Sequence, residues 1–223
     1  MGISQSLKRA FYAVGGRLPI VRDVVRTADT AAAITWRGLF RQKVLGHNRR
    51  AYWPMHFTSQ AHDVSRIRVG IGSAPGFSLG CYIQAKNGIE IGDYVIMAAN
   101  VGIISADHDS HAHAHHRAAP PIRIGDYSWI GMGAVILPGV ELGPHTVVAA
   151  GAVVNRSFPE GYCIVGGVPA KMLKQLDPEK VDCHRNEHEY IGFHALAGRK
   201  KEDVFRSLGI EEAPFHGASS REA

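Results

Sequence analysis

The chain has 223 residues, of which 45% are hydrophobic, and a formal net charge of +5, so it has enough apolar material for one substantial core. It has three cysteines and no CxxC pair, a sparse and odd set that argues against a disulfide framework and for a reducing compartment. No apolar run reaches membrane-spanning length and no signal-peptide pattern is recognised. These features exclude a disulfide-rich secreted protein and a helical integral membrane protein, and they predict a cytoplasmic one.

Residues 1–60 form the first predicted unit, a basic and helical segment. Residues 1–66 contain 11 Lys or Arg and 3 Asp or Glu, whereas the remaining 157 residues contain 14 and 17. Apolar residues at Ile20, Val24, Ile34, Phe40 and Val44 favour one or two amphipathic helices. The charge and the scattered aromatic residues suit peripheral contact with the inner face of a membrane. No nucleic-acid motif accompanies the charge, so we expect no nucleic-acid partner; an ordinary solvated helical surface stays open as the alternative.

A six-residue repeat defines the second predicted unit, residues 61–176. A period of six fits neither a helix nor an alternating strand. It fits a coil with three flat faces, in which each repeat supplies one short strand and one corner and its aliphatic side chain points inward. We therefore predict a mainly β fold, a parallel β-helix of roughly four to five coils stacked about 4.8 Å apart. The repeat positions are Leu79, Ala85, Ile91, Met97 and Ile103, and then Ile124, Ile130, Ile136, Leu142, Val148 and Val154.

The repeat is interrupted between Ile103 and Ile124, which are 21 positions apart. The interruption predicts a loop over residues 105–121, and a polar loop on a rigid scaffold is a common place for function. This loop contains five histidines: His108, His111, His113, His115 and His116. Alternation would put the imidazoles at 111, 113 and 115 on one side of an extended loop, where they could hold zinc. Solvent exposure, or contact of one of them with a substrate, is the other interpretation.

Four segments carry a resemblance to a known family. They are IGDYVIMAANVGIISADHD, PIRIGDYSWIGMGAVILPGVELG, VVAAGAVVNRSFPEGY and GGVPAKMLK, all within residues 67–176. In their order and spacing they resemble the hexapeptide-repeat acyl-CoA transferases, especially the sugar and polysaccharide O-acetyltransferase branch. The resemblance implies a left-handed β-helix, a homotrimer with active sites between subunits, and acetyl-CoA as co-substrate without a required metal. It implies transfer of an acetyl group to a hydroxyl of a sugar in a surface polysaccharide or its precursor, by direct attack in a ternary complex.

The same resemblance assigns the catalytic base. His108 matches the histidine that takes the proton from the acceptor hydroxyl, a task that suits imidazole because its ordinary pKa of about 6.5 leaves it neutral yet basic near pH 7. A carboxylate or a backbone carbonyl would fix the ring tautomer, and Asp107 and Asp109 are the nearest carboxylates in sequence. Arg117 could steer an anionic acceptor or be an ordinary surface arginine. Asn100 could stack at a corner of the coil or contact the acceptor. We therefore expect Asn100, Asp107, Asp109 and Arg117 on the acceptor side.

The donor side is assigned in the same way. Trp129 matches a tryptophan that lies along the pantetheine arm, although a face-filling aromatic side chain is the alternative. Small side chains and exposed backbone amides at Ala149 and Ala150 would let the thin arm lie against the coil. Lys171 and Lys174 would share one face if a helix starts there, and they would meet the phosphates of coenzyme A as point charges. The full expected donor set is Trp129, Gly131, Met132, Ala149, Ala150, Lys171 and Lys174.

Residues 177–223 form the third predicted unit, a helical extension with a flexible tail. Residues 177–212 are rich in charged, helix-forming residues. This composition predicts a helical cover on the last coil, where it would protect an open strand edge.

Two other enzyme classes stay open. A nucleotide-sugar N-acetyltransferase would use similar chemistry, but such enzymes carry an extra amino-terminal domain for which 60 residues are too few. A zinc-dependent hydratase of the γ-carbonic anhydrase type is built on the same kind of coil but needs histidines within its coils. Here His145, at a corner, is the one coil histidine.

Overall fold

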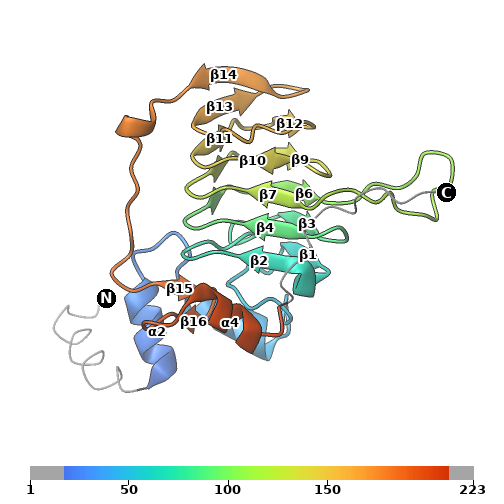
Figure 1. The fold of residues 1–223 in the computed structure, drawn as a ribbon. Helices are drawn as coiled ribbons and strands as arrows, with labels where there is room; N and C mark the ends of the chain where they lie inside the picture. The colour runs from blue at the N-terminus through green and yellow to red at the C-terminus, as the bar shows by residue number, and fades with distance from the viewer. Residues whose placement is uncertain (1–17, 211–223) are drawn as a thin grey trace, which may run out of the picture.

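The computed structural model describes residues 18–210, and most of them form a three-sided solenoid (Figure 1). Face 1 is the sheet β1-β3-β6-β9-β12, face 2 is β2-β4-β7-β10, and face 3 is β5-β8-β11-β13-β14. From β5 to β12 the chain visits face 3, face 1 and face 2 in turn, and these strands pair in parallel with those of the neighbouring coils. The coiled, mainly β architecture expected from the repeat is therefore present.

The strands are short, as six-residue units require. On face 1 they are β1 (Gln60–His62), β3 (Tyr82–Gln84), β6 (Gly102–Ile104), β9 (Val135–Ile136) and β12 (Val153–Val154). On face 2 they are β2 (Ile67–Val69), β4 (Ile89–Ile91), β7 (Ile122–Ile124) and β10 (Glu141–Leu142). On face 3 they are β5 (Ile96–Met97), β8 (Trp129–Ile130), β11 (Thr146–Val148), β13 (Cys163–Gly166) and β14 (Lys171–Gln175).

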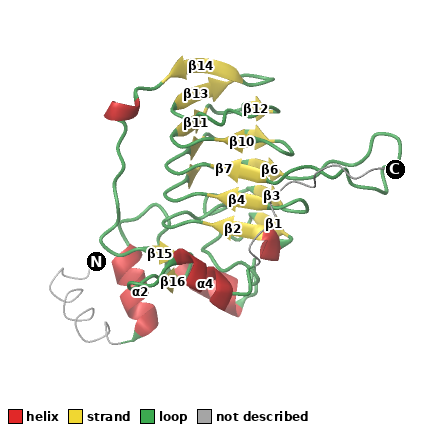
Figure 2. Cartoon of the chain, viewed as in Figure 1, coloured by secondary structure: helices red, strands yellow, loops and turns green. Residues whose placement is uncertain are grey.

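Helices lie mainly at one end of the solenoid, beside the first coil (Figure 2). The chain also has one separate two-stranded sheet at that end, β15 (Tyr190–Ile191) with β16 (His194–Ala195). The helical elements are α2 (Pro19–Thr27), α3 (Trp36–Leu39), the π-helix η1 (Phe40–Val44), the 3-10 helices η2 (Val64–Arg66) and η3 (Pro178–Lys180), and α4 (Lys201–Ser207). Within residues 18–210, no helix has the length and hydrophobicity needed to cross a lipid bilayer.

Aliphatic ladders fill the inside of the coil. On face 1, Ile103 pairs with Ile136 and Ile136 with Val154, and all three side chains are buried. Ile136 and Val154 are 18 positions apart, which is one full coil of three six-residue units. Burying each such side chain stabilises the fold by about 1.5–3 kcal/mol, so the repeat read from the sequence is also the core.

Leu79 departs from the expected inward pattern, because 53% of its side-chain surface is exposed. The reason lies in the first coil. The inward residues Val69 on face 2 and Ile83 on face 1 are 14 positions apart rather than the 12 of two regular units. Ile83 and Ile91, which lies on face 2, are in turn 8 positions apart rather than 6, so counting back in sixes from Ile91 misses Ile83 and reaches Leu79. Ser73, which fits the repeat poorly by type, is buried.

One corner of the solenoid carries a stack of aromatic rings. The ring of Tyr94 stacks on Tyr127 at 5.2 Å, Tyr127 on His145 at 4.9 Å, and His145 on Tyr162 at 5.2 Å between centroids. All four residues have left-handed backbone, with φ between 46° and 57°, so each makes the same sharp corner. Burial lowers the pKa of His145 below its ordinary value.

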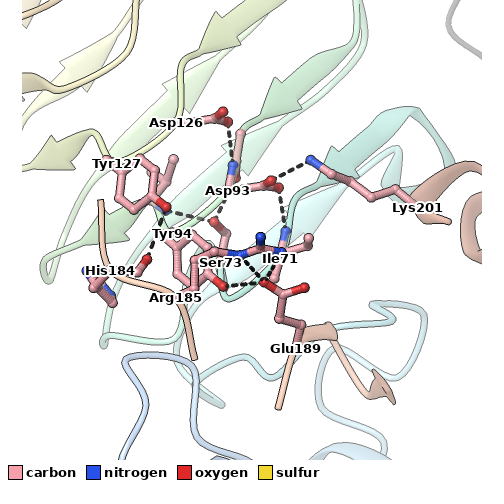
Figure 3. Close-up of polar contacts among 12 residues, drawn as sticks. Ile71, Ser73, Asp93, Tyr94, Asp126, Tyr127, His184, Arg185, Glu189 and Lys201 are labelled. Carbon is pink, nitrogen blue, oxygen red and sulfur yellow. Dashed lines mark hydrogen bonds and ion pairs between the residues drawn. The ribbon is translucent and has the colours of Figure 1, made fainter. Parts of the chain in front are cut away.

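The carboxyl-terminal segment runs down this corner and is tied to it (Figure 3). Tyr127 donates a hydrogen bond to the carbonyl of His184 at 3.0 Å, and Tyr94 donates to a carboxylate oxygen of Glu189 at 3.0 Å. Arg185 pairs with Glu189 at 2.7 Å. Nearby, Lys201 at the start of α4 pairs with Asp93. The segment therefore returns from the last coil to the first.

This path corrects the expected helical cover on the last coil. Residues 177–210 hold a short 3-10 helix beside the later coils, and then a two-stranded sheet and a single seven-residue helix, α4, which lie at the first coil. Phe193 donates its amide to the carbonyl of Tyr52 at 2.9 Å, and the Arg68 guanidinium of β2 lies 4.5 Å from the Phe205 ring of α4. The edge of the last coil is covered instead by β14, which pairs antiparallel with β13. The expected flexible tail lies largely outside the described residues.

The amino-terminal segment closes the open end of the first coil. Trp53 is fully buried, and its indole N–H donates to the carbonyl of Pro75 at 2.7 Å. The Tyr52 hydroxyl donates to the carbonyl of Ile67 and accepts from the amide of Val69, so it satisfies backbone groups of β2. Burial raises the pKa of Tyr52. Residues 1–17, which belong to the expected basic segment, lie outside the described residues.

Candidate functional site

The histidine loop leaves the solenoid at the corner between face 1 and face 2, after β6 and before β7 (Figure 1). Its two sides run antiparallel: His108 bridges to His116, and the amide of Arg117 donates to the carbonyl of Asp107 at 2.9 Å. At the tip, one carboxylate oxygen of Asp109 accepts from the amides of His111 and Ala112. Asp109 therefore shapes the turn, as aspartates do in such loops.

His108 is exposed, and a backbone carbonyl orients its ring. Nδ1 lies 2.5 Å from the carbonyl oxygen of His113. A carbonyl can only accept, so Nδ1 carries the hydrogen and Nε2 keeps its lone pair in the neutral ring. The ring of His116 lies 4.2 Å away between centroids. Burial first, and then the charges of Lys86 and His108, lower the pKa of His116, which favours a neutral ring beside that of His108.

Two side chains outside the expected site, those of Asn87 and Gln84, anchor the base of this loop. Asn87 Nδ2 donates to the carbonyl of Ser105 at 2.8 Å and to the carbonyl of Arg117 at 3.0 Å, so it holds both sides together. The side-chain amide of Gln84 bonds the amide and the carbonyl of Ala106. Their signal in the sequence is weak, because Asn and Gln at solenoid corners and edges are common as structural residues.

The expected acceptor-side residues do not converge on one point. Asp107 and Arg117 are exposed on opposite sides of the loop base. The Asp109 side chain accepts hydrogen bonds within the turn of the loop. Asn100 is an exposed corner residue with a left-handed backbone, φ 59°, and its backbone N–H donates to the carbonyl of Leu79. For Asn100 the corner interpretation thus has direct structural support, and contact of any of the four with an acceptor stays a prediction.

Face 3 carries a continuous outward column of side chains. Across neighbouring strands, Ile96 pairs with Trp129, Trp129 with Val147, Val147 with Ile164, and Ile164 with Lys174. Trp129 is 54% exposed, so it does not fill a gap between coils. Three strand spacings separate β8, which carries Trp129, from β14, which carries Lys174. At about 4.8 Å for each spacing, this separation is about 14 Å. The column is apolar along its length and cationic at one end.

The lysines stand on a strand and not on the expected helix. Lys171 and Lys174 belong to β14, whose five residues are all exposed. Gly167, with φ 97°, turns the chain after β13, so the following residues pair back onto the last edge of the sheet. Lys171 lies opposite Gly166, and Lys174 lies opposite Ile164. The two side chains still lie on one strand at the same end of face 3.

The small residues of the expected donor groove are partly used for stacking. Gly131 is buried and donates its amide to the carbonyl of Val148 at 2.8 Å, and Ala149 donates its amide to Val165 at 2.8 Å. The amide of Ala149 is therefore not exposed, which corrects that part of the expectation. Met132 is 57% exposed. Ala150 is exposed as well, and its amide makes no hydrogen bond within the described part of the chain.

The two candidate regions lie apart in one chain. The loop leaves at the corner between faces 1 and 2, whereas the column of Trp129 and Lys174 runs along face 3, the side opposite that corner. A three-sided solenoid cannot bring its own corner to its opposite face. If His108 and this column act together, they must come from two different protomers.

The outward side chains of the other two faces differ in kind. Face 2 carries the alternating charges Arg68, Glu90, Arg123 and Glu141 at paired positions, with Arg123 bonded to Glu90 at 3.1 Å. Such a ladder of charges is typical of a face that is exposed to solvent. Face 1 instead presents Tyr82, Gly102, Val135 and Val153 at paired positions. Faces 1 and 3 are thus the two with apolar outward columns. Across residues 18–210, no three His, Cys, Asp or Glu side chains are grouped so as to hold a metal ion.

Comparison with known proteins gives the following relatives. Residues 121–156 match the family model described as bacterial transferase hexapeptide (six repeats). The chain is 29% identical over 150 residues to the galactoside O-acetyltransferase of Escherichia coli (strain K12), which covers 66% of this chain and 68% of that protein. It is 38% identical over 94 residues to a Schizosaccharomyces pombe (strain 972 / ATCC 24843) protein named as an acetyltransferase, which covers 41% of this chain and 45% of that protein. The match thus spans about half the length of that relative.

Among solved structures, the fold is similar to a galactoside acetyltransferase in complex with coenzyme A. The TM-score is 0.52 at 21% sequence identity, over 77% of this chain and 88% of that one. This likeness concerns the fold. The matched repeat and the aliphatic ladders that it forms show that residues 121–156 are hexapeptide repeats, and in sequence the chain is similar to proteins named as acetyltransferases, the Escherichia coli galactoside O-acetyltransferase among them.

Proposed function

We propose that this protein is an acetyl-CoA-dependent O-acetyltransferase that acts on a hydroxyl of a sugar in a surface polysaccharide or its precursor. One observation supports the proposal most: the carbonyl of His113 holds Nδ1 of His108 protonated, so that Nε2 is a free base on an exposed loop. A general base needs this arrangement, with one ring nitrogen fixed and the other available. The sugar O-acetyltransferase relationship supplies the reaction type.

The proposed step moves one proton and one acetyl group. Nε2 of His108 accepts the proton of the acceptor hydroxyl while that oxygen attacks the thioester carbonyl. The tetrahedral intermediate collapses, the carbon–sulfur bond breaks, and the imidazolium returns the proton to the sulfur of coenzyme A. The His113 carbonyl accepts the Nδ1–H bond throughout and stabilises the positive ring. Direct transfer in a ternary complex needs no acyl-enzyme and no metal ion.

The outward column of face 3 fits the donor. Its apolar side chains, Ile96, Trp129, Val147 and Ile164, would pack against a thin pantetheine arm. The free amide of Ala150 could pair with one of the amide carbonyls of that arm. Lys171 and Lys174 would meet the coenzyme A phosphates at the far end of the column. Gly131 is assigned to coil stacking in this scheme.

A homotrimer would complete the site. His108 and the face 3 column cannot meet within one chain, whereas a three-fold arrangement of parallel solenoids can place the loop of one chain beside face 3 of the next. The apolar outward columns of faces 1 and 3 support burial between protomers, and the charged ladder of face 2 supports exposure to solvent. We infer that the coil is left-handed, as the family resemblance implies, and that the protein acts in the cytoplasm.

The test is His108→Ala, assayed with acetyl-CoA against a panel of sugars, lipid-linked glycans and amino sugars. Loss of a general base lowers turnover by about 10²–10⁴-fold. The affinity for coenzyme A and the assembly mass should not change. His111→Ala, an exposed histidine of the same loop, is the matched control and should keep most activity. Preserved activity in His108→Ala would mean that another group accepts the proton. Turnover with amines alone would replace the O-acetyl proposal by N-acetyl transfer.

A further inference from the structure

The helical stretch 36–45 is inverted: its apolar side faces solvent and its buried side chain is polar. Trp36, Phe40 and Val44, spaced four residues apart on α3 and η1, are 47%, 54% and 69% exposed. Leu45 is also exposed. Gln42 is 1% exposed. A surface helix normally turns its apolar stripe toward the core, so this stripe lacks a partner within the described residues.

Hydrogen bonds of the Gln42 side chain keep the apolar side of this helical stretch exposed. Its Nε2 donates to the carbonyls of Ala51 and Trp53 at 3.2 and 2.9 Å, and its Oε1 accepts from the amide of Met55 at 3.1 Å. These bonds lie in the buried region that closes the first coil. Since the polar side of the helix is held from beneath, its apolar side cannot rotate inward without breaking them.

The stretch of chain that contains the stripe carries one sign of charge. Between residues 30 and 59 the chain has five Lys or Arg residues and no Asp or Glu. Arg37 and Arg41 each follow one of the exposed aromatic residues, and the Arg41 guanidinium lies 4.3 Å from the ring centroid of Phe57, which is also exposed. We call Trp36, Arg37, Phe40, Arg41, Val44, Leu45 and Phe57 the basal patch. Exposed aromatic and aliphatic side chains among arginines match the interface of an anionic bilayer.

We propose that the basal patch docks the protein on an anionic phospholipid surface. The apolar side chains would enter the headgroup region, and the arginines would meet the lipid phosphates. A uniformly basic rim favours this occupant over another protein, whose complementary surface would have to carry acidic residues only. The patch lies at the first-coil end of the solenoid, where β1 is the outermost strand of face 1.

This orientation places the histidine loop near the lipid. β6, which the loop follows, is the third strand of face 1 from that end, so the loop base stands about 10 Å above β1 at the usual strand spacing. A lipid-linked glycan could reach it there. In this respect the inference rests on the proposed function. The proposed trimer would add avidity, because its three patches would face the same membrane. The patch itself belongs to one chain and needs neither.

The test is co-sedimentation of the full-length protein with vesicles, without acetyl-CoA or acceptor. Vesicles of phosphatidylcholine and phosphatidylglycerol at about 3:1 should bind the protein, and binding should weaken with salt because it is partly electrostatic. Pure phosphatidylcholine vesicles should bind it at least about tenfold more weakly. Arg37→Gln with Arg41→Gln should lower partitioning about 25-fold, since each basic residue at an anionic surface is worth about a factor of five.

Trp36→Ser with Phe40→Ser should lower partitioning at least about tenfold. Val168→Ser is the matched control, because Val168 is also exposed but lies between β13 and β14, at the opposite end of the solenoid; it should partition like the unaltered protein. Failure of the unaltered protein to bind anionic vesicles, or unchanged binding by both patch variants, would overturn the inference. A change in the assembly mass of the patch variants would also overturn it, because such a change would show that the patch is a self-association surface. Transfer to a water-soluble sugar should survive in the patch variants, so a failed docking test leaves the proposed activity separately testable.

Discussion

Gly131→Ala tests the stacking of the coils at a point where a single methyl group has no room. A Cβ built at Gly131 would lie 2.6 Å from the amide nitrogen of Ala150, 2.7 Å from the carbonyl oxygen of Val148 and 2.9 Å from the carbonyl carbon of Ala149. All three are backbone atoms of the next coil, so none can rotate away. Ordinary contacts begin at about 3.5 Å, so the coils would have to part locally by up to about 0.9 Å.

The cost follows from two effects. Overpacking of this kind destabilises a protein by about 1–3 kcal/mol. Parting the coils also stretches the 2.8 Å bond from the Gly131 amide to Val148, and a lost hydrogen bond costs about 1 kcal/mol. We expect a loss of about 2–4 kcal/mol in the free energy of unfolding, which lowers Tm by about 5–15 °C for a chain of this size. Thermal and urea unfolding followed by far-UV circular dichroism would measure it.

Gly102→Ala is the control, because within the chain a Cβ there would meet the Val135 side chain at 3.5 Å, which is an ordinary contact. Because Gly102 lies on the outward column proposed to be buried between protomers, the assembly mass of this variant is measured as well. Its stability should change by less than about 1 kcal/mol, and we expect a gain because alanine restricts the unfolded chain. If Gly131→Ala were as stable as the unaltered protein but bound coenzyme A more weakly, the stacking argument would be refuted. Gly131 would then act in the donor groove, as the family resemblance implies.

The donor and corner assignments predict two further outcomes. Lys171→Gln with Lys174→Gln should weaken coenzyme A binding by about tenfold at low salt and less at high salt, measured by calorimetry. Lys180→Gln, an exposed lysine on η3, should leave it unchanged, and equal effects would contradict the assignment. Because burial lowers the pKa of His145, the unfolded chain binds more protons below about pH 6.5, so stability should fall as pH drops from about 7.5 to 5.5. His145→Tyr, which matches the other three corner rings, should make that fall shallower; an identical pH dependence would show that His145 does not contribute.

The regular part of the fold could be predicted because its signal lies in the spacing of residues that are close in sequence. From Ile124 to Val154 every sixth residue is aliphatic and buried, so the spacing alone identifies the inward side. The first coil could not be predicted in this way. Its extra residues shift the register twice, between Val69 and Ile83 and between Ile83 and Ile91, and no local signal marks where they are inserted.

The carboxyl-terminal third could be predicted least, because its structure depends on distant partners. Residues 171–175 form a strand because the open edge of β13 offers unpaired backbone groups, and this tertiary effect outweighs local helix preference. The segment around Arg185 and Glu189 lies along the solenoid because Tyr94 and Tyr127 bond it. The exposure of His108 followed from its place in the loop, whereas its tautomer depends on the His113 carbonyl five residues away.

The central claim, an active site shared by two chains, is tested most directly by mixing two inactive variants. One carries His108→Ala and the other Trp129→Ala with Lys171→Gln and Lys174→Gln. After the two are unfolded and refolded together in equal amounts, each site of a randomly assembled trimer has about one chance in four of combining an intact loop with an intact neighbouring column. The account predicts recovery of about a quarter of the unaltered specific activity, against near zero for either variant refolded alone. Mixed assemblies that form and stay inactive would contradict it, because they would place the loop and the column of one site in the same chain.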